Sequence, residues 1–131
     1  MKISSQAHYG LQAAIILTKK YPESVSATEL ERLIGVSKKY LERIMRSLSN
    51  AGLVLATRGV SGGYALKDEP KNISCGQVIR TLEKDLKIVD CLGAPCSKKC
   101  ESLFVWTKLY TGINEILNSI SLYDATYNKG E

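Results

Sequence analysis

Residues 26–52 read SATELERLIGVSKKYLERIMRSLSNAG, and this stretch decides the fold. Ser26 is followed three residues later by Glu29, which predicts a capping box in which the two side chains satisfy each other's free backbone donors. A short helix over 27–34 should follow this box. Gly35 then provides a left-handed exit from the helix.

A second, longer helix follows directly. Ser37 can cap a helix that begins at Lys38 and ends at Asn50 or Ala51, because Gly52 stops it. Two helices joined by a tight glycine turn are the helix-turn-helix pattern.

The segment before this motif predicts one more helix. Apolar residues recur at three- and four-residue spacing from Ser4 or Ser5 to about Tyr21, and Pro22 ends the pattern. The recurring residues are Ala7, Leu11, Ala14, Ile15 and Leu17.

The segment after the motif predicts a β-hairpin. Short strands are expected over 53–56 and 64–66, and the tip between them is basic and rich in glycine. A hairpin directly behind a helix-turn-helix is the wing of a winged-helix domain. Residues 1–72 are therefore expected to form a winged helix-turn-helix DNA-binding domain.

Residues 73–131 predict a cysteine segment and a dimerisation helix, packed as one structural unit with the first domain. Ser74 and Gln77 form another capping box, and the helix they start should reach about Glu83. A wide apolar stripe from Leu103 to Ile120 marks a long helix with more apolar surface than one small domain readily covers. A partner helix in a homodimer would cover it, and packing on its own domain is the alternative. The expected fold class is mainly α with a small β-hairpin.

Charge is distributed unevenly along the chain. The formal net charge is +5, and residues 1–72 carry eleven Lys or Arg against six Asp or Glu, whereas residues 73–131 carry seven of each. The whole excess therefore lies in the predicted DNA-binding half, which fits contact with a polyanion; a basic but inert surface is the alternative.

The predicted recognition helix and wing supply the candidate DNA contacts. The first turns of such a helix enter the major groove, and a basic wing tip of small residues can approach the minor groove. Glu42 is the most discriminating candidate, because a carboxylate is repelled by DNA unless a cytosine amino group compensates; simple pairing with Arg46 is the alternative. The candidates are Ser37, Lys38, Lys39, Tyr40, Glu42, Arg43, Arg58, Ser61 and Gly62.

Three cysteines lie within ten residues, at Cys91, Cys96 and Cys100. Thiolates favour iron-sulfur clusters, zinc or copper(I), and three of them leave one ligand of a four-coordinate site to be found elsewhere. A structural zinc site or a metal-free thiol switch are the alternatives to an iron-sulfur cluster. Cys75 lies apart, in the first turn of a predicted helix, and is expected to be a small buried residue rather than a ligand; thiol activation by the helix dipole is the alternative.

Over nearly its full length, the chain resembles the bacterial winged-helix regulator family that includes IscR, NsrR and CymR. The matching segments are Met-Lys-Ile-Ser at the start, Lys39-Tyr40-Leu41-Glu42, Asn50-Ala51-Gly52-Leu53-Val54, Arg58-Gly59 with Gly62-Gly63-Tyr64, and the three cysteines before Trp106. The resemblance implies a homodimer built on the C-terminal helix, a palindromic operator in double-stranded DNA, and, for the cluster-binding branch, ligation by Cys91, Cys96 and Cys100. We expect a 2Fe-2S rather than a 4Fe-4S cluster, with zinc as the alternative.

Two departures from the family pattern concern the fourth ligand. The cysteines are separated by four and three residues rather than about five, and Leu103 stands where IscR-like members carry a ligating histidine. In the NsrR-like pattern, a residue near the start of the first helix of the other subunit completes the site. The resemblance places His8, the only histidine, at that position; water, a small thiol or Glu101 are the alternatives.

Other classes of protein are disfavoured. The single histidine has no nucleophile motif beside it and no phosphate-binding glycine loop is present, so the chain is not expected to be an enzyme. Without an apolar run of about 18 residues, a membrane span is not expected either. We expect a cytoplasmic location, where cysteines serve metal or redox chemistry more often than disulfides.

Overall fold

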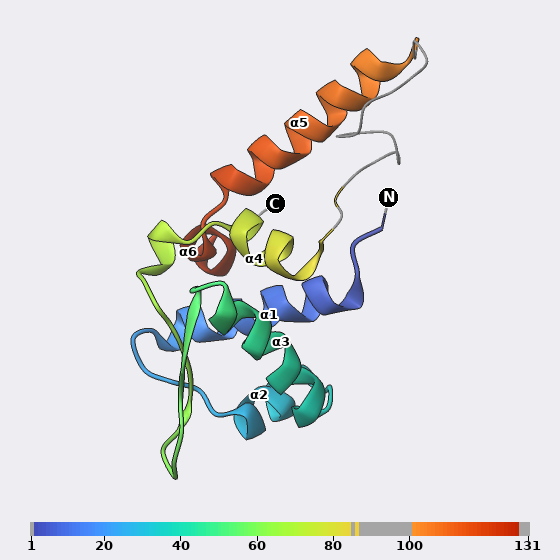
Figure 1. Cartoon of the computed structure of the whole chain (residues 1–131). Coiled ribbons are helices and arrows are strands. Elements are labelled where there is room, and N and C mark those ends of the chain that lie inside the picture. The colour runs from blue at the N-terminus through green and yellow to red at the C-terminus, as the bar shows by residue number, and fades with distance from the viewer. Residues whose placement is uncertain (1, 85, 87–100, 129–131) are drawn as a thin grey trace.

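The computed structural model describes residues 2–84, 86 and 101–128. It is mainly helical with one two-stranded antiparallel hairpin, which confirms the predicted fold class (Figure 1). The elements in chain order are α1 (Ser5–Lys20), α2 (Ala27–Ile34), α3 (Lys38–Asn50), β1 (Val54–Thr57), β2 (Gly63–Leu66), the 3-10 turn η1 (Pro70–Asn72), α4 (Cys75–Leu82), α5 (Leu103–Ser119) and α6 (Leu122–Tyr127).

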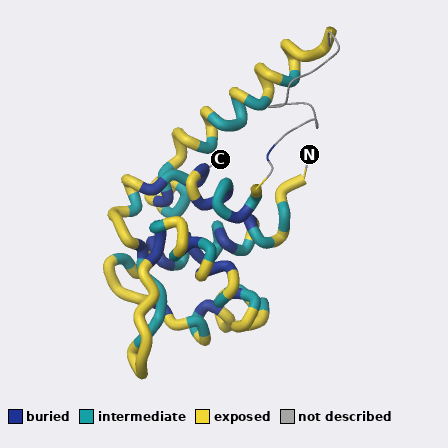
Figure 2. Tube along the Cα trace, in the orientation of Figure 1, coloured by how far each residue is buried: buried dark blue, intermediate teal, exposed yellow. Residues whose placement is uncertain are grey.

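One hydrophobic core joins the helix-turn-helix to α1, α4 and α6. Burial concentrates on the inward faces of these helices, and Figure 2 shows it as dark segments where they meet. The largest fully buried side chains are Leu17, Leu30, Leu41, Ile44, Met45, Leu48, Val78 and Leu122. Because α1 packs against α2, α3, α4 and α6, it is the central element that holds the DNA-reading helices to the C-terminal part of the chain.

The helix-turn-helix forms as predicted, with one correction. Gly35 has φ 87° and ends α2 in the left-handed region. Ser37 Oγ accepts from Tyr40 N at 3.2 Å and so caps α3. Ser26 Oγ likewise accepts from Glu29 N, but the predicted capping box is wrong, since the Glu29 carboxylate turns away from the cap and accepts from the Arg32 guanidinium.

The wing is anchored through its backbone. Strands β1 and β2 pair from Val54 opposite Leu66 to Thr57 opposite Gly63, one residue from the predicted limits. Tyr64 of β2 also pairs with Val25, which precedes α2: Val25 N donates to Tyr64 O (2.8 Å) and Tyr64 N to Val25 O (2.9 Å). The wing is therefore fixed to the start of the helix-turn-helix.

The beginning of α4 and a short final helix are tied together. The predicted capping box of Ser74 and Gln77 is confirmed. Helix α6 was not predicted, although Ser121 and Asp124 form a capping box at its start. Two backbone hydrogen bonds, Cys75 N to Ile120 O (2.7 Å) and Leu122 N to Ile73 O (2.8 Å), join the two helix starts.

Helix α5 extends away from the rest of the described chain, on the side opposite the wing (Figure 1). None of its residues is fully buried, and Figure 2 shows no buried segment along it. Its exposed apolar residues include Phe104 (74% exposed), Ile116 (60%), Val105 (54%) and Leu109 (46%).

The start of α1 lies beside the end of α4. Ser4 N donates to Glu83 Oε2 at 2.6 Å, so the cap of one helix is bonded to the residue that ends the other. Cys91, Cys96 and Cys100 lie outside the described residues. The predicted division at residue 72 stays a prediction.

None of the helices in the described ranges is both long and apolar enough to cross a membrane.

Candidate nucleic-acid interface

Helix α3 separates an apolar face from a charged one. Leu41, Ile44, Met45 and Leu48 are buried, which fixes the rotation of the helix. Lys38, Lys39, Arg43 and Arg46 are exposed, and Glu42 is half-buried. Among the described residues, the one ion pair joins Arg32 to Glu29. The simple pairing of Glu42 with Arg46 is therefore not formed.

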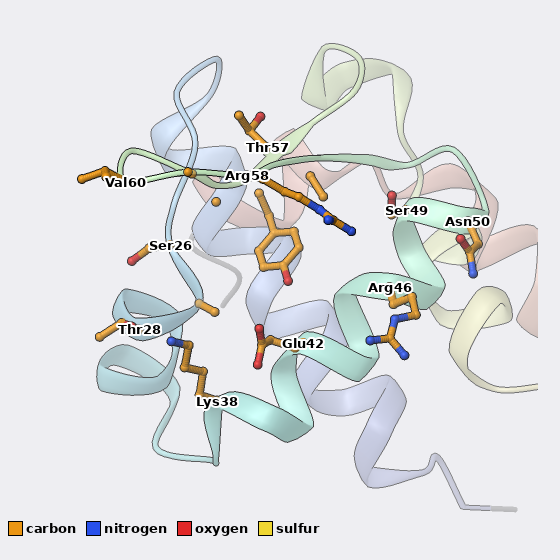
Figure 3. A pocket seen from close by; sticks show the side chains of 16 residues that line it. Ser26, Thr28, Lys38, Glu42, Arg46, Ser49, Asn50, Thr57, Arg58 and Val60 are labelled. Atoms are coloured by element: carbon orange, nitrogen blue, oxygen red, sulfur yellow. The ribbon is translucent and has the colours of Figure 1, made fainter.

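A polar hollow of about 650 Å³ lies between α3 and the wing. Figure 3 shows Glu42 and Arg46 on α3 together with Arg58, which projects from the wing into the space between the two elements. Residues before and within the first turn of α2 also line the hollow, among them Ser26 and Thr28. The recognition helix and the wing therefore present their polar side chains to one shared space.

The structure brings only some of the candidate DNA residues into this hollow. Four of the candidates line the hollow: Lys38, Glu42, Arg58 and Gly62. The rest, Ser37, Lys39, Tyr40, Arg43 and Ser61, do not line it. Polar residues that were not proposed from the sequence also line it, among them Ser26, Thr28, Arg46, Ser49, Asn50, Thr57 and Tyr64. The sequence could have identified Arg46, because its four-residue spacing from Glu42 places both side chains on one face of the helix.

Tyr64 closes the hollow between wing and helix. Burial raises the pKa of its phenol, the Glu42 carboxylate raises it further, and the Arg46 guanidinium opposes this. The hydroxyl therefore remains protonated at neutral pH and can donate a hydrogen bond in this space. Both charged side chains lie close enough to act on it electrostatically.

Tyr40 packs toward α1. Its ring meets the Tyr9 ring edge-on, with centroids 6.2 Å apart, and the Arg43 guanidinium lies 5.8 Å from the Tyr40 centroid. Tyr40 is half-buried against the core, and its ring supports the Arg43 guanidinium.

The wing tip requires glycine at two positions. Gly59 has φ 111°, a backbone region that side chains disfavour. A Cβ on Gly62 would overlap Thr57 O across the turn. Arg58 and the fully exposed Val60 stand on this tight tip, where nothing bulky keeps them from a ligand surface.

Residues proposed as metal ligands are described only in part. His8 is exposed on α1, and its Nε2 lies 3.2 Å from Gln12 Nε2. His8 is one helical turn beyond Ser4, the residue bonded to Glu83. The described ranges hold no group of three or more His, Cys, Asp or Glu residues suited to a metal ion.

Cys75 is a buried thiol. Its Sγ lies 3.7 Å from Ser121 O, to which it donates, and burial raises its pKa, as does the nearby Asp124 charge. These surroundings oppose the thiolate that activation by the helix dipole would require. They support the interpretation of Cys75 as a small core residue.

The chain matches the model of the Rrf2 family, described as iron-dependent transcriptional regulators, over residues 3–128. It is 38% identical to the HTH-type transcriptional regulator CymR of Bacillus subtilis over 133 residues, covering 100% of this chain and 94% of CymR. The structure of CymR, titled the global cysteine regulator of B. subtilis, superposes with a TM-score of 0.86 at 33% identity, covering 99% of both chains.

Two further structures are similar over almost the whole chain. IscR of T. potens has a TM-score of 0.81 and 34% identity, covering 99% of this chain and 89% of IscR. The oxidised form of Staphylococcus aureus CymR has a TM-score of 0.82 and 29% identity, covering 100% of both chains.

Proposed function

The chain belongs to the Rrf2 family of DNA-binding transcriptional regulators, and from this premise we propose that it is a homodimer that binds a palindromic operator under the control of its three-cysteine segment. Membership of a regulator family also means that it is not an enzyme. The observation that carries the proposal is the shared hollow between α3 and the wing. It leaves α3 free to enter the major groove and the wing free to reach the minor groove on one face of the protein.

Different residues contact the DNA bases in the two grooves. Helix α3 enters the major groove with Lys38, Glu42 and Arg46, and the wing brings Arg58 to the adjacent minor groove. Lys39 and Arg43, exposed on the same helix, meet phosphates. Ser37, Tyr40, Ser61 and Gly62 complete the surface by capping, packing or close backbone approach.

Glu42 supplies discrimination rather than affinity. It lies beside Tyr64 and has no ion-pair partner among the described residues. A cytosine amino group that donates to this carboxylate offsets the repulsion by DNA, whereas other bases leave the carboxylate uncompensated.

The dimer forms through α5. Phe104, Val105, Leu109, Ile113 and Ile116 line an apolar hollow along one side of this helix. A second copy of the same helix covers such a face, and the two-fold axis this creates matches a palindromic operator.

The chemistry of the proposed donor set fits a soft metal centre. Three thiolates and one imidazole suit a 2Fe-2S cluster or zinc. Cys91, Cys96 and Cys100 would hold the group, and His8 would complete the set. Such a group supplies sensitivity to iron, nitric oxide or oxidants. His8 is accessible, because it is exposed and, among the described residues, its ring contacts Gln12 and Tyr9 of the same helix.

Chain connectivity couples the cysteine segment to DNA binding. The segment runs from the end of α4 to the start of α5, and α4 packs on both α1 and α3. Any rearrangement that favours one placement of α4 over another therefore reaches the recognition helix through direct packing.

Two measurements test the proposal. Selection of bound duplexes from a random DNA library should yield a palindrome for the purified protein. Iron, acid-labile sulfide and zinc content of anaerobically purified protein should show iron and sulfide in equal amounts, lost in Cys96→Ala and retained in the control Cys75→Ala. Unchanged cofactor content and operator selection in Cys96→Ala would contradict the sensing proposal.

A second candidate is a regulator with a structural zinc site or a metal-free thiol switch. The solved oxidised form of S. aureus CymR favours the thiol alternative for a chain this similar. Zinc that persists after anaerobic reconstitution with iron and sulfide would identify the structural site. Protection of two cysteines from iodoacetamide after mild oxidation, in metal-free protein, would identify the switch.

A further inference from the structure

Arg80 of α4 holds α5 through three hydrogen bonds. Its Nε donates to Asn114 Oδ1 (2.9 Å), and its Nη2 donates to Asn118 Oδ1 (2.6 Å) and Asn114 O (3.3 Å). Asn114 and Asn118 are one helical turn apart, on the same face of α5. A single guanidinium therefore spans one turn of the helix.

The surroundings are shaped for this contact. Asn114 Nδ2 donates to Tyr110 O (2.9 Å), which leaves Asn114 Oδ1 facing Arg80. A Cβ on Gly76, one turn before Arg80, would lie 2.8 Å from Arg80 Nη1 and 2.9 Å from Asn118 Oδ1. Glycine at this position leaves room for the guanidinium. We call Gly76, Arg80, Asn114 and Asn118 the Arg80 clamp.

Among the described residues, the apolar contacts of α5 with the rest of the chain are partial. Tyr110 and Leu117 are half-buried against the core, and no residue of α5 is fully buried. Apolar contacts of this kind tolerate rotation, whereas a planar guanidinium that meets two amide oxygens in fixed directions does not. The backbone bond from Cys75 N to Ile120 O holds the end of α5, and the Arg80 clamp adds a directional side-chain contact to the body of the protein along the last two turns of the helix.

We propose that the Arg80 clamp sets the angle between α5 and the winged-helix body, and thereby the spacing of operator half-sites that the dimer accepts. The inference rests on the proposed function, namely a dimer through α5 on a palindromic operator. Each base pair added between half-sites moves them about 3.4 Å apart and rotates one against the other by about 35°. A dimer with a fixed angle between its two winged-helix bodies therefore matches one half-site spacing. A dimer in which this angle can vary matches several spacings.

The test compares variants of the full chain on duplexes with identical half-sites. The spacer between half-sites is the selected length, or is shortened or lengthened by one or two base pairs, and a single half-site is included. Arg80→Met removes the clamp and one positive charge. Arg32→Met is the charge-matched control, because Arg32 is an exposed residue on α2 whose carboxylate partner is on the same helix.

We expect the wild-type protein and Arg32→Met to prefer one spacer. Arg80→Met should lose affinity for that spacer by about tenfold, equivalent to 1.4 kcal/mol, with affinity for the single half-site unchanged and the spacer preference flattened. A wild-type spacer profile in Arg80→Met overturns the inference. Equal loss on every duplex, half-site included, also overturns it, because that pattern reports a general structural defect.

Two further results separate this inference from the proposed function. Wild-type protein that binds half-sites without any spacer preference overturns the clamp proposal and leaves DNA binding intact. Wild-type protein that selects no duplex overturns the proposed function itself. Should Arg80→Met not fold, Asn118→Ala removes one acceptor without a change of charge and serves for the same comparison, with a flattened spacer profile supporting the proposal and an unchanged profile opposing it.

Discussion

Gly10 of α1 lies directly against Leu82 of α4, so that a Cβ on Gly10 would overlap Leu82 Cδ1. Both residues are buried, and Leu82 is the last residue of α4 before the connection to the cysteine segment. The two helices are therefore in close contact at the point where the winged helix-turn-helix meets the C-terminal part of the chain.

This contact predicts non-additive changes in stability. Gly10→Ala should destabilise the fold by about 1–3 kcal/mol through overpacking, and Leu82→Ala by about 2–5 kcal/mol through loss of a buried side chain. The double variant should cost less than the sum, because the smaller side chain at position 82 makes room for the added methyl group. Urea unfolding of the four proteins measures this, and strict additivity would show that the two sites do not meet.

Arg58 should contribute to DNA binding through the attraction between its positive charge and the DNA phosphates. Arg58→Ala should weaken binding and reduce the slope of log K against log salt concentration by about 1, because one fewer counterion is released. Arg32→Ala should leave the slope unchanged, since Arg32 is bonded to Glu29 and does not line the hollow. Fluorescence anisotropy across a salt series gives both slopes, and equal reductions would argue against a specific role of the wing.

Glu42 should control specificity. Glu42→Ala should reduce discrimination at one operator position by about 1–3 kcal/mol, the scale of one base contact, while affinity for the best operator stays equal or rises. The control is Glu23→Ala, an exposed carboxylate in the turn after α1. Competition between operator variants measures the change, and unaltered base preference in Glu42→Ala would exclude this role.

The apolar side of α5 should mediate dimerisation. Leu109→Glu should raise the dimer dissociation constant by about 100-fold or more, because an interface would bury an unpaired charge. Thr111→Glu puts the same charge at an exposed position of the helix that does not line the apolar hollow, and should stay dimeric. Sedimentation equilibrium distinguishes the two, and a dimeric Leu109→Glu would move the interface elsewhere.

Cys75 should be unreactive in the folded protein. In a variant with Cys91, Cys96 and Cys100 replaced by Ser, native alkylation by iodoacetamide should be at least about tenfold slower than in denaturant, since the buried thiol reacts only when the structure opens. The raised pKa of the folded thiol acts in the same direction, because it keeps Cys75 in the protonated form, which is not the nucleophile. Rapid labelling at neutral pH would contradict this prediction and would indicate that Cys75 is a reactive thiol in the folded protein.

Local signals predicted most of the fold. Gly35, Ser37 and the Ser74–Gln77 box act over three or four residues, and each behaves as its sequence spacing indicates. The Ser26 box failed because Arg32 competes for the Glu29 carboxylate, a choice that depends on side-chain geometry. Helix α6 is short, but the Ser121 and Asp124 spacing carried a signal that could have found it.

The candidate site was less predictable, because much of it depends on tertiary contacts. The periodicity of α3 indicated its exposed face, but no local pattern shows that the Tyr40 ring packs on Tyr9 of another helix. Tyr64 enters the hollow because β2 pairs with Val25, a residue far away in the sequence. The role of Arg80 likewise depends on α5 lying across α4, which a sequence spacing of 34 residues to Asn114 does not reveal.

The exposed apolar face of α5 has a consequence for regulation in the cell. The dimer proposed above, in which a second copy covers this surface, would tie operator occupancy to the amount of protein present. When most of the protein is monomeric, the dimer concentration rises with the square of the total concentration, so a modest change in synthesis produces a larger change in repression or activation. Under the proposed dimerisation, the unburied side of one helix would thus make copy number itself an input to the regulator.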